Sequence, residues 1–330
     1  MLKRGFTLIE LLVAMAALAF VLLYTLGTFT ANRNTYVVIE SVSEAHQNTL
    51  AIASLIERDL RHAGYMVRGA TAACGVDSTT GPDTLFVSDS DAILTADDLE
   101  STSVEGHLGA EATGGMGTSW TSPRTITLST LVLDRDASDN PSPSYDTDGN
   151  GTPDSDFRPN AGVIFANPDF PSYGVYCGTV TAVDVANSQI TVALASPPPS
   201  ATFGRWVFVP AHVFSIQAGA LRRDGVVMAP DVEDLQAAWF YDFDENDQIS
   251  NAAENPGASG SPVLDASSLA DASLLREVRF NLVVRTSDDD PNHPTAGIGQ
   301  PRENQTVAPA ADRRRRRVHT STIRLRNLAT

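Results

Sequence analysis

The sequence lacks the residue patterns that carry catalysis. It has no GxSxG nucleophile elbow and no GxxxxGK[ST] phosphate loop. The six histidines show neither HExxH nor any other paired-ligand spacing: His46, His62, His107, His212, His293 and His319. Carboxylates are abundant but are concentrated in segments typical of turns. We therefore predict that the chain is not an enzyme.

Positive charge is scarce, and lysine is almost absent. The formal net charge is −17, and Lys3 is the only lysine. This acidity argues against a nucleic-acid partner, which would require a basic surface. The exception is a run of five arginines at 313–317. Such a run could bind phosphate, lipid headgroups or acidic partner subunits, but we interpret it as a solvated segment opposite Asp288, Asp289 and Asp290.

Cysteine is also rare. Only Cys74 and Cys177 are present, and neither lies in a CxxC motif or near a histidine with zinc-site spacing. We predict a disulfide, which would close a loop of about one hundred residues in an oxidising compartment. Two buried thiols are the alternative.

One long apolar run stands at the start of the chain. Residues 6–29 contain 24 residues with a single charge, Glu10. At about 1.5 Å per residue, a helix of this length spans about 36 Å, enough to cross the hydrocarbon core of a bilayer. Lys3 and Arg4 precede the run, which predicts that the N-terminus lies in the cytoplasm and the rest of the chain outside it.

Glu10 requires a partner. A carboxylate in the middle of a membrane helix costs about 2.5–3.5 kcal/mol to insert unless it is paired. The only peptidase-like junction, between Gly5 and Phe6, precedes the apolar run. Cleavage there would free an amine on Phe6, about one helical turn from Glu10 in the same or a neighbouring subunit.

These residues carry a family resemblance. The segment KRGFTLIE at 3–10 resembles the type III leader of type IV prepilins and pseudopilins. The resemblance implies cleavage after Gly5 by a prepilin peptidase and N-methylation of Phe6. It also implies packing of the helix in a filament core, with Glu10 neutralising an amino terminus. An uncleaved signal anchor is the alternative.

The rest of the chain predicts an α+β fold. Apolar residues recur every three or four positions from Val38 to Leu60 and indicate one amphipathic continuation of the helix, ending near Ala63 with Gly64 in a left-handed conformation. Beyond Gly64, short alternating runs indicate an antiparallel sheet with long loops. The expected strands are 84–87, 125–133, 189–194, 205–209, 213–217, 237–241, 275–285 and 320–325.

The predicted organisation has four parts. These are a cleaved leader at 1–5, a transmembrane half-helix at 6–29, an amphipathic half-helix at 30–63, and a β-rich extracytoplasmic domain at 64–330. Polar insertions are expected near 137–160, 251–272 and 286–312.

Later segments narrow the resemblance. The helix exit at 58–65 with Cys74, and the segments 232–241, 278–285 and 322–327, are similar in order and spacing to PilW-type minor pilins. This implies the type IV pilin fold and a minor pilin that helps prime or cap the type IV pilus. The implied partners are the major pilin, other minor pilins, the prepilin peptidase, the inner-membrane assembly platform and a tip adhesin. The protein would reside in the inner membrane and then on surface pili.

Two other functions remain open. A J-class pseudopilin of a type II secretion system shares the leader and the helix end. A membrane-anchored calcium-binding or adhesive module would use the helix only as a tether, but a lone anchor has no use for Glu10.

Two acidic loops have the spacing of calcium ligands. The first loop presents oxygen ligands from Asp146, Asp148, Asn150, Asp154 and Asp156, with Gly151 at the turn, but has no glutamate at position 12. The second, weaker loop presents Asp242, Asp244 and Asn246. Both can equally be turns without metal, because Asp, Asn and Gly favour turns.

Overall fold

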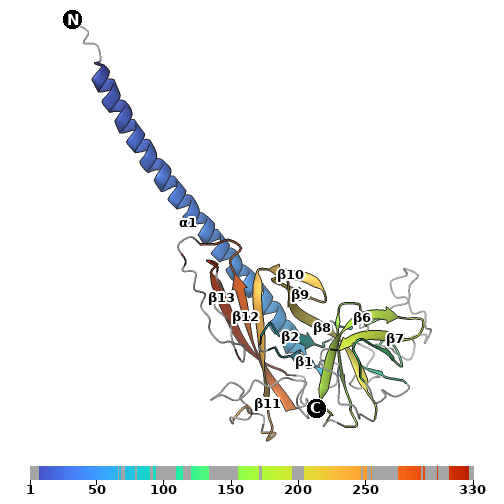
Figure 1. Ribbon diagram of the computed structural model, residues 1–330. Helices are drawn as coiled ribbons and strands as arrows, with labels where there is room; N and C mark the ends of the chain where they lie inside the picture. Colours follow the sequence, from blue (N-terminus) through green and yellow to red (C-terminus); the bar gives the residue numbers. More distant parts are fainter. Residues whose placement is uncertain are drawn as a thin grey trace, which may run out of the picture.

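The computed structural model shows one long helix and a β-rich globular part (Figure 1). The structure describes residues 7–65, 67, 71–78, 80–89, 92–93, 109–113, 120–133, 155–170, 173–194, 204–246, 248–250, 254, 274–290, 293, 303 and 312–326.

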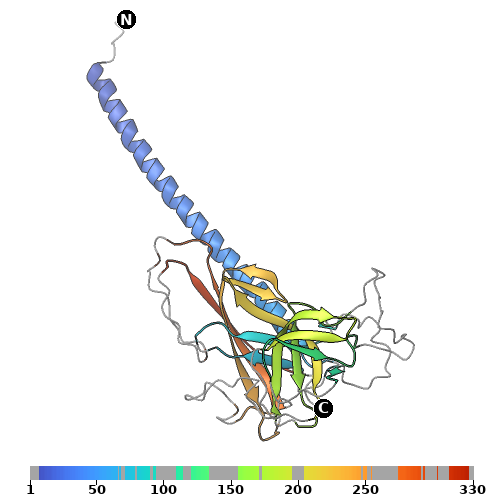
Figure 2. The ribbon, with the colours of Figure 1, turned by 45° about the vertical axis from the view of Figure 1, so that its right-hand side comes forward.

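Helix α1 (Leu8–His62) is 55 residues long. Its first half stands clear of the globular part in both ribbon views (Figures 1 and 2). Its second half buries the predicted apolar stripe: Ala45, Thr49, Ile52, Ile56 and Leu60 are buried, whereas Val38 and Val42 are half-buried. The helix ends as the sequence predicts.

Gly64 secures that end. It takes a φ of 82°, a left-handed conformation that glycine adopts without a Cβ clash. Its N–H donates to the carbonyl of Ser88 at 3.0 Å, which ties the helix end to the segment after strand β2. The helix therefore has a fixed exit into the globular part.

A three-stranded antiparallel sheet lies along the second half of α1 (Figures 1 and 2). Its order is β11 (Val232–Tyr241), β12 (Leu275–Arg285) and β13 (Arg316–Arg324). Val278, Phe280, Leu282 and Val284 of β12 belong to the core shared with α1, as the alternation in this strand predicts. Burial of this sheet face against the helix fixes both elements.

A larger antiparallel sheet of ten strands completes the globular part. Its main path is β1-β2-β8-β5-β6-β7-β4, with β3 and β9 paired to β8 and β10 paired to β9. The strands are β1 (Ala73–Val76), β2 (Thr84–Val87), β3 (Ala110–Glu111), β4 (Arg124–Thr127), β5 (Gly162–Ala166), β6 (Val175–Asp184), β7 (Gln189–Leu194), β8 (Val207–Gln217), β9 (Ala220–Arg223) and β10 (Val226–Pro230).

The described residues of the globular part form two hydrophobic cores. The first joins α1 to the three-stranded sheet and to the part of the ten-stranded sheet that includes β1, β2 and β9. The second lies within the ten-stranded sheet and is aromatic: the Phe165 ring stacks on Phe208 at 4.7 Å and on Trp120 at 5.6 Å, and Trp206 packs edge-on against both Phe165 and Trp120. This second core is remote from the helix.

The α+β class is confirmed, but two strand predictions were wrong. The predicted strands 205–209 and 213–217 form the single strand β8. Pro210 suggested a break, since proline lacks an N–H, but it lies where the neighbouring strand on one side changes from β3 to β2. The predicted strand 125–133 stops at Thr127, followed only by a bridge at Leu128.

The predicted disulfide is present. Cys74 of β1 and Cys177 of β6 are bonded across a separation of 103 residues, and both are buried. The bond joins β1, at one end of the main path of the ten-stranded sheet, to β6, and both cysteines belong to the first core. It therefore adds a covalent link within that core.

Candidate functional site

The start of α1 holds Glu10 in a defined position. Thr7 is the N-cap, and its hydroxyl accepts from the Glu10 N–H at 3.4 Å. The Glu10 carboxylate in turn accepts from the Thr7 N–H and the Thr7 hydroxyl, both at 2.9 Å. This capping box satisfies two helix-end donors. The N–H that the carboxylate accepts from belongs to Thr7, the residue that follows Phe6 in the chain.

Gly5 and Phe6 themselves lie outside the described residues. The predicted cleavage and methylation therefore stay predictions. Thr7 was not predicted as a partner of Glu10, since only an amine on Phe6 was expected there. Its signal was present, because threonine followed three residues later by glutamate before an apolar run is the capping-box pattern.

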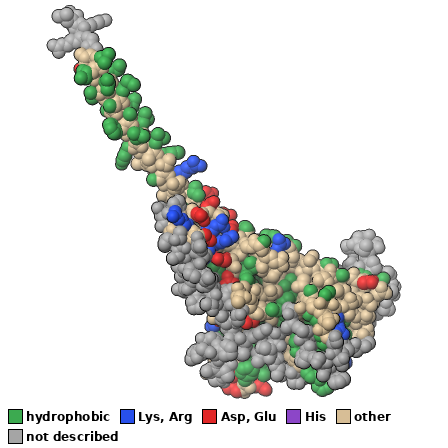
Figure 3. Space-filling view, viewed as in Figure 1, with side chains coloured by type: hydrophobic (Ala, Val, Ile, Leu, Met, Phe, Trp, Pro, Cys, Tyr) green, Lys and Arg blue, Asp and Glu red, His purple; other side chains and the backbone are tan. Residues whose placement is uncertain are grey.

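The first half of α1 is built for an apolar environment. Its large side chains are exposed, including Leu8 at 81% and Phe20 at 74%. The hydroxyls of Thr25, Thr28 and Thr30 donate to helix carbonyls three residues earlier, at 2.9 Å each. Polar groups satisfied within the helix can enter a bilayer at low cost. Within the described residues, α1 is the one helix long and apolar enough to cross a membrane (Figure 3).

The arginine run lies at the start of β13, as a partly paired segment. Arg315 contacts Asp290 at 2.6 Å, and Arg314 contacts Asp289 at 3.5 Å, so two of the three predicted acidic neighbours lie against the run. Arg316 pairs with Asp312 and with Glu233 of β11. Glu233 was not foreseen, since it is distant in the sequence. These ion pairs of the arginine run therefore help to hold β13, the edge strand of the three-stranded sheet.

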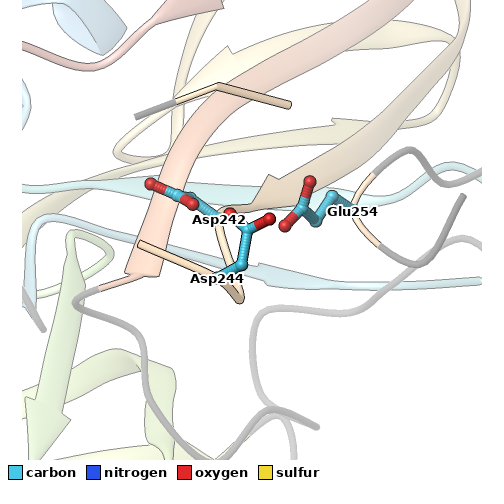
Figure 4. Close-up of side chains that lie close together, drawn as sticks. All are labelled: Asp242, Asp244 and Glu254. Atoms are coloured by element: carbon cyan, nitrogen blue, oxygen red, sulfur yellow. The ribbon is translucent and has the colours of Figure 1, made fainter. Parts of the chain in front are cut away.

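The second acidic loop brings three carboxylates together. Oxygens of Asp242, Asp244 and Glu254 lie within 4.8 Å of one another. Asp242 and Asp244 follow β11, and Asp244 and Glu254 point toward each other (Figure 4). The backbone N–H of Asn246 donates to Asp242 at 3.0 Å and to Asp244 at 3.3 Å, while its side-chain oxygen accepts from the Gln248 N–H at 2.8 Å.

The electrostatics of this cluster favour a positive ligand. Desolvation and then the charge of Glu254 raise the pKa of Asp244 above its ordinary value, while the Asn246 N–H lowers it. Arg276 compensates part of the charge, with its Nε 3.4 Å from an Asp242 oxygen. Carboxylate oxygens are the ligands calcium prefers. Calcium binding at this loop stays a prediction.

The first acidic loop is largely outside the described residues. This holds for Asp146, Asp148, Asn150 and Asp154. Asp156 is described and buried, and its carboxylate accepts from the Leu133 N–H at 2.6 Å. That oxygen has a structural partner, so Asp156 holds the segment after the loop against residues 131–133.

A buried histidine lies between two acids, and no pattern in the sequence indicates it. His212 of β8 has Nδ1 2.6 Å from Asp224 and Nε2 3.7 Å from Asp89. Only 4% of its side chain is exposed, which leaves no access for a substrate. We interpret it as a structural element that links β8 to the turn after β9.

Comparison with known proteins bears on the N-terminus. Residues 1–26 match the family model of the prokaryotic N-terminal methylation motif. This is the motif of a type IV pilin-like protein, pilin or pseudopilin. No curated protein and no solved structure matches the chain. The function of the globular part is therefore inferred from its own residues and contacts.

The family match covers the segment that contains the Thr7–Glu10 capping box. The motif implies processing by the prepilin peptidase and assembly with other pilin-like subunits. The apolar first half of α1 implies membrane anchoring before assembly. The match does not distinguish a pilus subunit from a secretion pseudopilin.

Proposed function

We propose that this chain is a PilW-type minor pilin that assembles into a type IV pilus and helps to prime or cap it. The observation that carries the proposal is the methylation motif at 1–26 on a helix whose sole acid between Leu8 and Phe29 is Glu10. Thr7, the second residue after the predicted cleavage position, holds the Glu10 carboxylate through its N–H and its hydroxyl. Such a carboxylate can neutralise the amine of a neighbouring subunit in an apolar filament core, where an unpaired charge is costly.

The globular part supports a subunit present in few copies. The second core, with its aromatic centre at Phe165, adds bulk away from the helix. Bulk of this kind is compatible with a filament tip, where neighbours do not restrict the size of a subunit. A tip position predicts that gold labels on the protein mark pilus ends, and even labelling along the shaft would contradict it.

The experiment compares Glu10→Ala with Glu40→Ala in a piliated host. Glu40 is an exposed acid on the same helix beyond the apolar run, so its variant removes an equal charge. We expect both proteins in the membrane with Phe6 as the first residue, but only Glu40→Ala in sheared filaments. Equal incorporation of Glu10→Ala would contradict the role of Glu10 in assembly, and absence of the wild-type protein from sheared filaments would contradict a filament role and favour the tether.

A further inference from the structure

A small pocket lies beside the hairpin of β9 and β10, next to the second half of α1 (Figures 1 and 2). It has a volume of about 270 Å³. The hairpin contributes Arg223, Val226 and Met228 to its lining, and the turn that precedes β5 contributes Arg158 and Pro159. The pocket therefore combines two arginines with apolar side chains.

Both arginines of the pocket have a donor without an acceptor. The Nε groups of Arg158 and Arg223 are buried from solvent, and neither donates a hydrogen bond to any described residue. A buried donor without an acceptor costs more free energy than an ordinary hydrogen bond contributes. The pocket thus offers two guanidinium donors to an anion.

The charges around the pocket leave it positive. Arg158 has no ion pair among the described residues. Arg223 contacts Asp59 of α1 at 2.8 Å, but Asp59 also accepts from Arg58 at 2.9 Å. Asp224 is the one acid in the pocket lining. Three arginines against two aspartates leave an excess of positive charge, in a chain whose net charge is −17.

Contacts at both of its walls hold the pocket in shape. Asp224, at the turn of the hairpin, lies 2.6 Å from Nδ1 of His212 and accepts from the Val213 N–H at 2.9 Å. The next residue, Gly225, has a φ of 79°, and a Cβ there would lie 2.9 Å from that of Asn160. The hairpin and the turn before β5 are therefore packed together, and Asp224 is already engaged by the protein itself.

An apolar edge strand borders the pocket. On one side β10 pairs with β9, and on the other it pairs with no strand among the described residues. Val226, Val227 and Met228 are 64%, 49% and 44% exposed. Met228 is the extra residue of a β-bulge, a feature that often re-aims a side chain at a binding site. An exposed apolar edge of this kind is a template for pairing with another chain.

We infer that the pocket and β10 together bind an extended segment of a neighbouring subunit that carries an aspartate or a glutamate. Its carboxylate would accept from Arg158 and Arg223, whose planar donors match carboxylate geometry. Its backbone would pair with the free edge of β10, and its apolar side chains would cover Val226 and Met228. A polypeptide satisfies the edge, the apolar surface and the arginines at once.

This inference rests on the proposed function, because a minor pilin present in few copies meets other subunits rather than a second copy of itself. It adds the kind of segment that the partner supplies and the surface that receives it.

The test is photo-crosslinking in the piliated host. Benzoylphenylalanine replaces Val227, which is exposed on β10 and does not line the pocket. Intact cells are irradiated, and the crosslinked peptide is identified by mass spectrometry. We expect one product with a different subunit, in a segment that contains an aspartate or a glutamate. Arg158→Gln should lower its yield about tenfold, the effect expected for loss of a charge-assisted hydrogen bond.

Two further variants separate the pocket from general effects of charge and folding. Arg326→Gln removes an equal charge from an exposed position outside the pocket and should leave the yield unchanged. Arg158→Glu should abolish the product, and replacing the identified acid of the partner with arginine should restore it. No product, a product with a second copy of this chain, a yield that does not depend on Arg158, or failure of this charge exchange would overturn the inference.

The outcome can be distinguished from that of the filament test. Wild type in sheared filaments without a product that depends on Arg158 would overturn the pocket alone. Absence of wild type from filaments, with the product still formed, would overturn the filament role alone.

Discussion

The carboxylate of Asp59, near the end of α1, contacts the guanidinium of Arg223 on β9 at 2.8 Å. Asp59 is fully buried, and Arg58 reaches its other oxygen at 2.9 Å. The pair joins the helix to a strand 164 positions later in the chain. It is the kind of contact that fixes how the helix enters the globular part.

Replacing Arg223 with alanine should destabilise the protein. It leaves a buried carboxylate with less compensation, which typically costs about 3–5 kcal/mol. Arg222→Ala on the same strand is the control. Among the described residues its guanidinium donates to the Gly225 carbonyl alone, so the change should cost less than about 1 kcal/mol. Urea unfolding of the purified protein measures both, and equal midpoints would contradict a role for the Asp59–Arg223 pair.

Loss of the disulfide should destabilise the globular part. On the chain-entropy description, a loop of about one hundred residues corresponds to about 4–5 kcal/mol. The Cys74→Ser/Cys177→Ser variant should therefore unfold at lower urea than wild type, and a reducing agent should lower only the wild-type midpoint. A wild-type midpoint that does not respond to reduction would count against the bond.

Stability should fall as the pH rises through the titration of Asp83. Burial raises the pKa of Asp83 from 3.8 to about 7. The N–H groups of Ala237 and Ser78 donate hydrogen bonds to its carboxylate and oppose this rise. The folded state then binds a proton more tightly than the unfolded state, so stability falls between about pH 4 and pH 7.

Asp83→Asn removes this titration. Wild type should lose roughly 1–4 kcal/mol between pH 5 and pH 8 from this group, and the variant should lack that part of the pH dependence. Urea unfolding at both pH values gives the comparison. If wild type and Asp83→Asn lose the same stability between the two pH values, Asp83 has an ordinary pKa in the folded protein.

Calcium should bind at the acidic cluster after β11. Calorimetric titration should show this site in wild type and in Glu245→Gln, a neighbouring exposed acid outside the cluster, whereas Asp244→Asn should bind one calcium ion fewer than wild type. Asp146→Ala/Asp148→Ala tests the first loop in the same way. The absence of heat in wild type would remove both calcium predictions.

Local patterns in the sequence were sufficient for the helix and for several strands. The three-or-four spacing up to Leu60, the glycine at 64 and the alternation in β12 each depend on neighbouring residues, and each is found in the structure. The disulfide could also be predicted, because only two cysteines exist.

Contacts between distant residues could not be read in the same way. Glu254 joins Asp242 and Asp244 from a segment without any recognisable pattern. His212 meets Asp89 only because β2 and β8 are paired. Such placements depend on sheet pairing, which short-range periodicity does not determine.

The most direct test of the minor-pilin role is a clean deletion of the gene, scored in parallel for surface pili, twitching and secreted exoproteins. A minor pilin predicts loss of pili and twitching with intact secretion. Normal pili with exoproteins retained in the periplasm would contradict it and assign the chain to a type II secretion system.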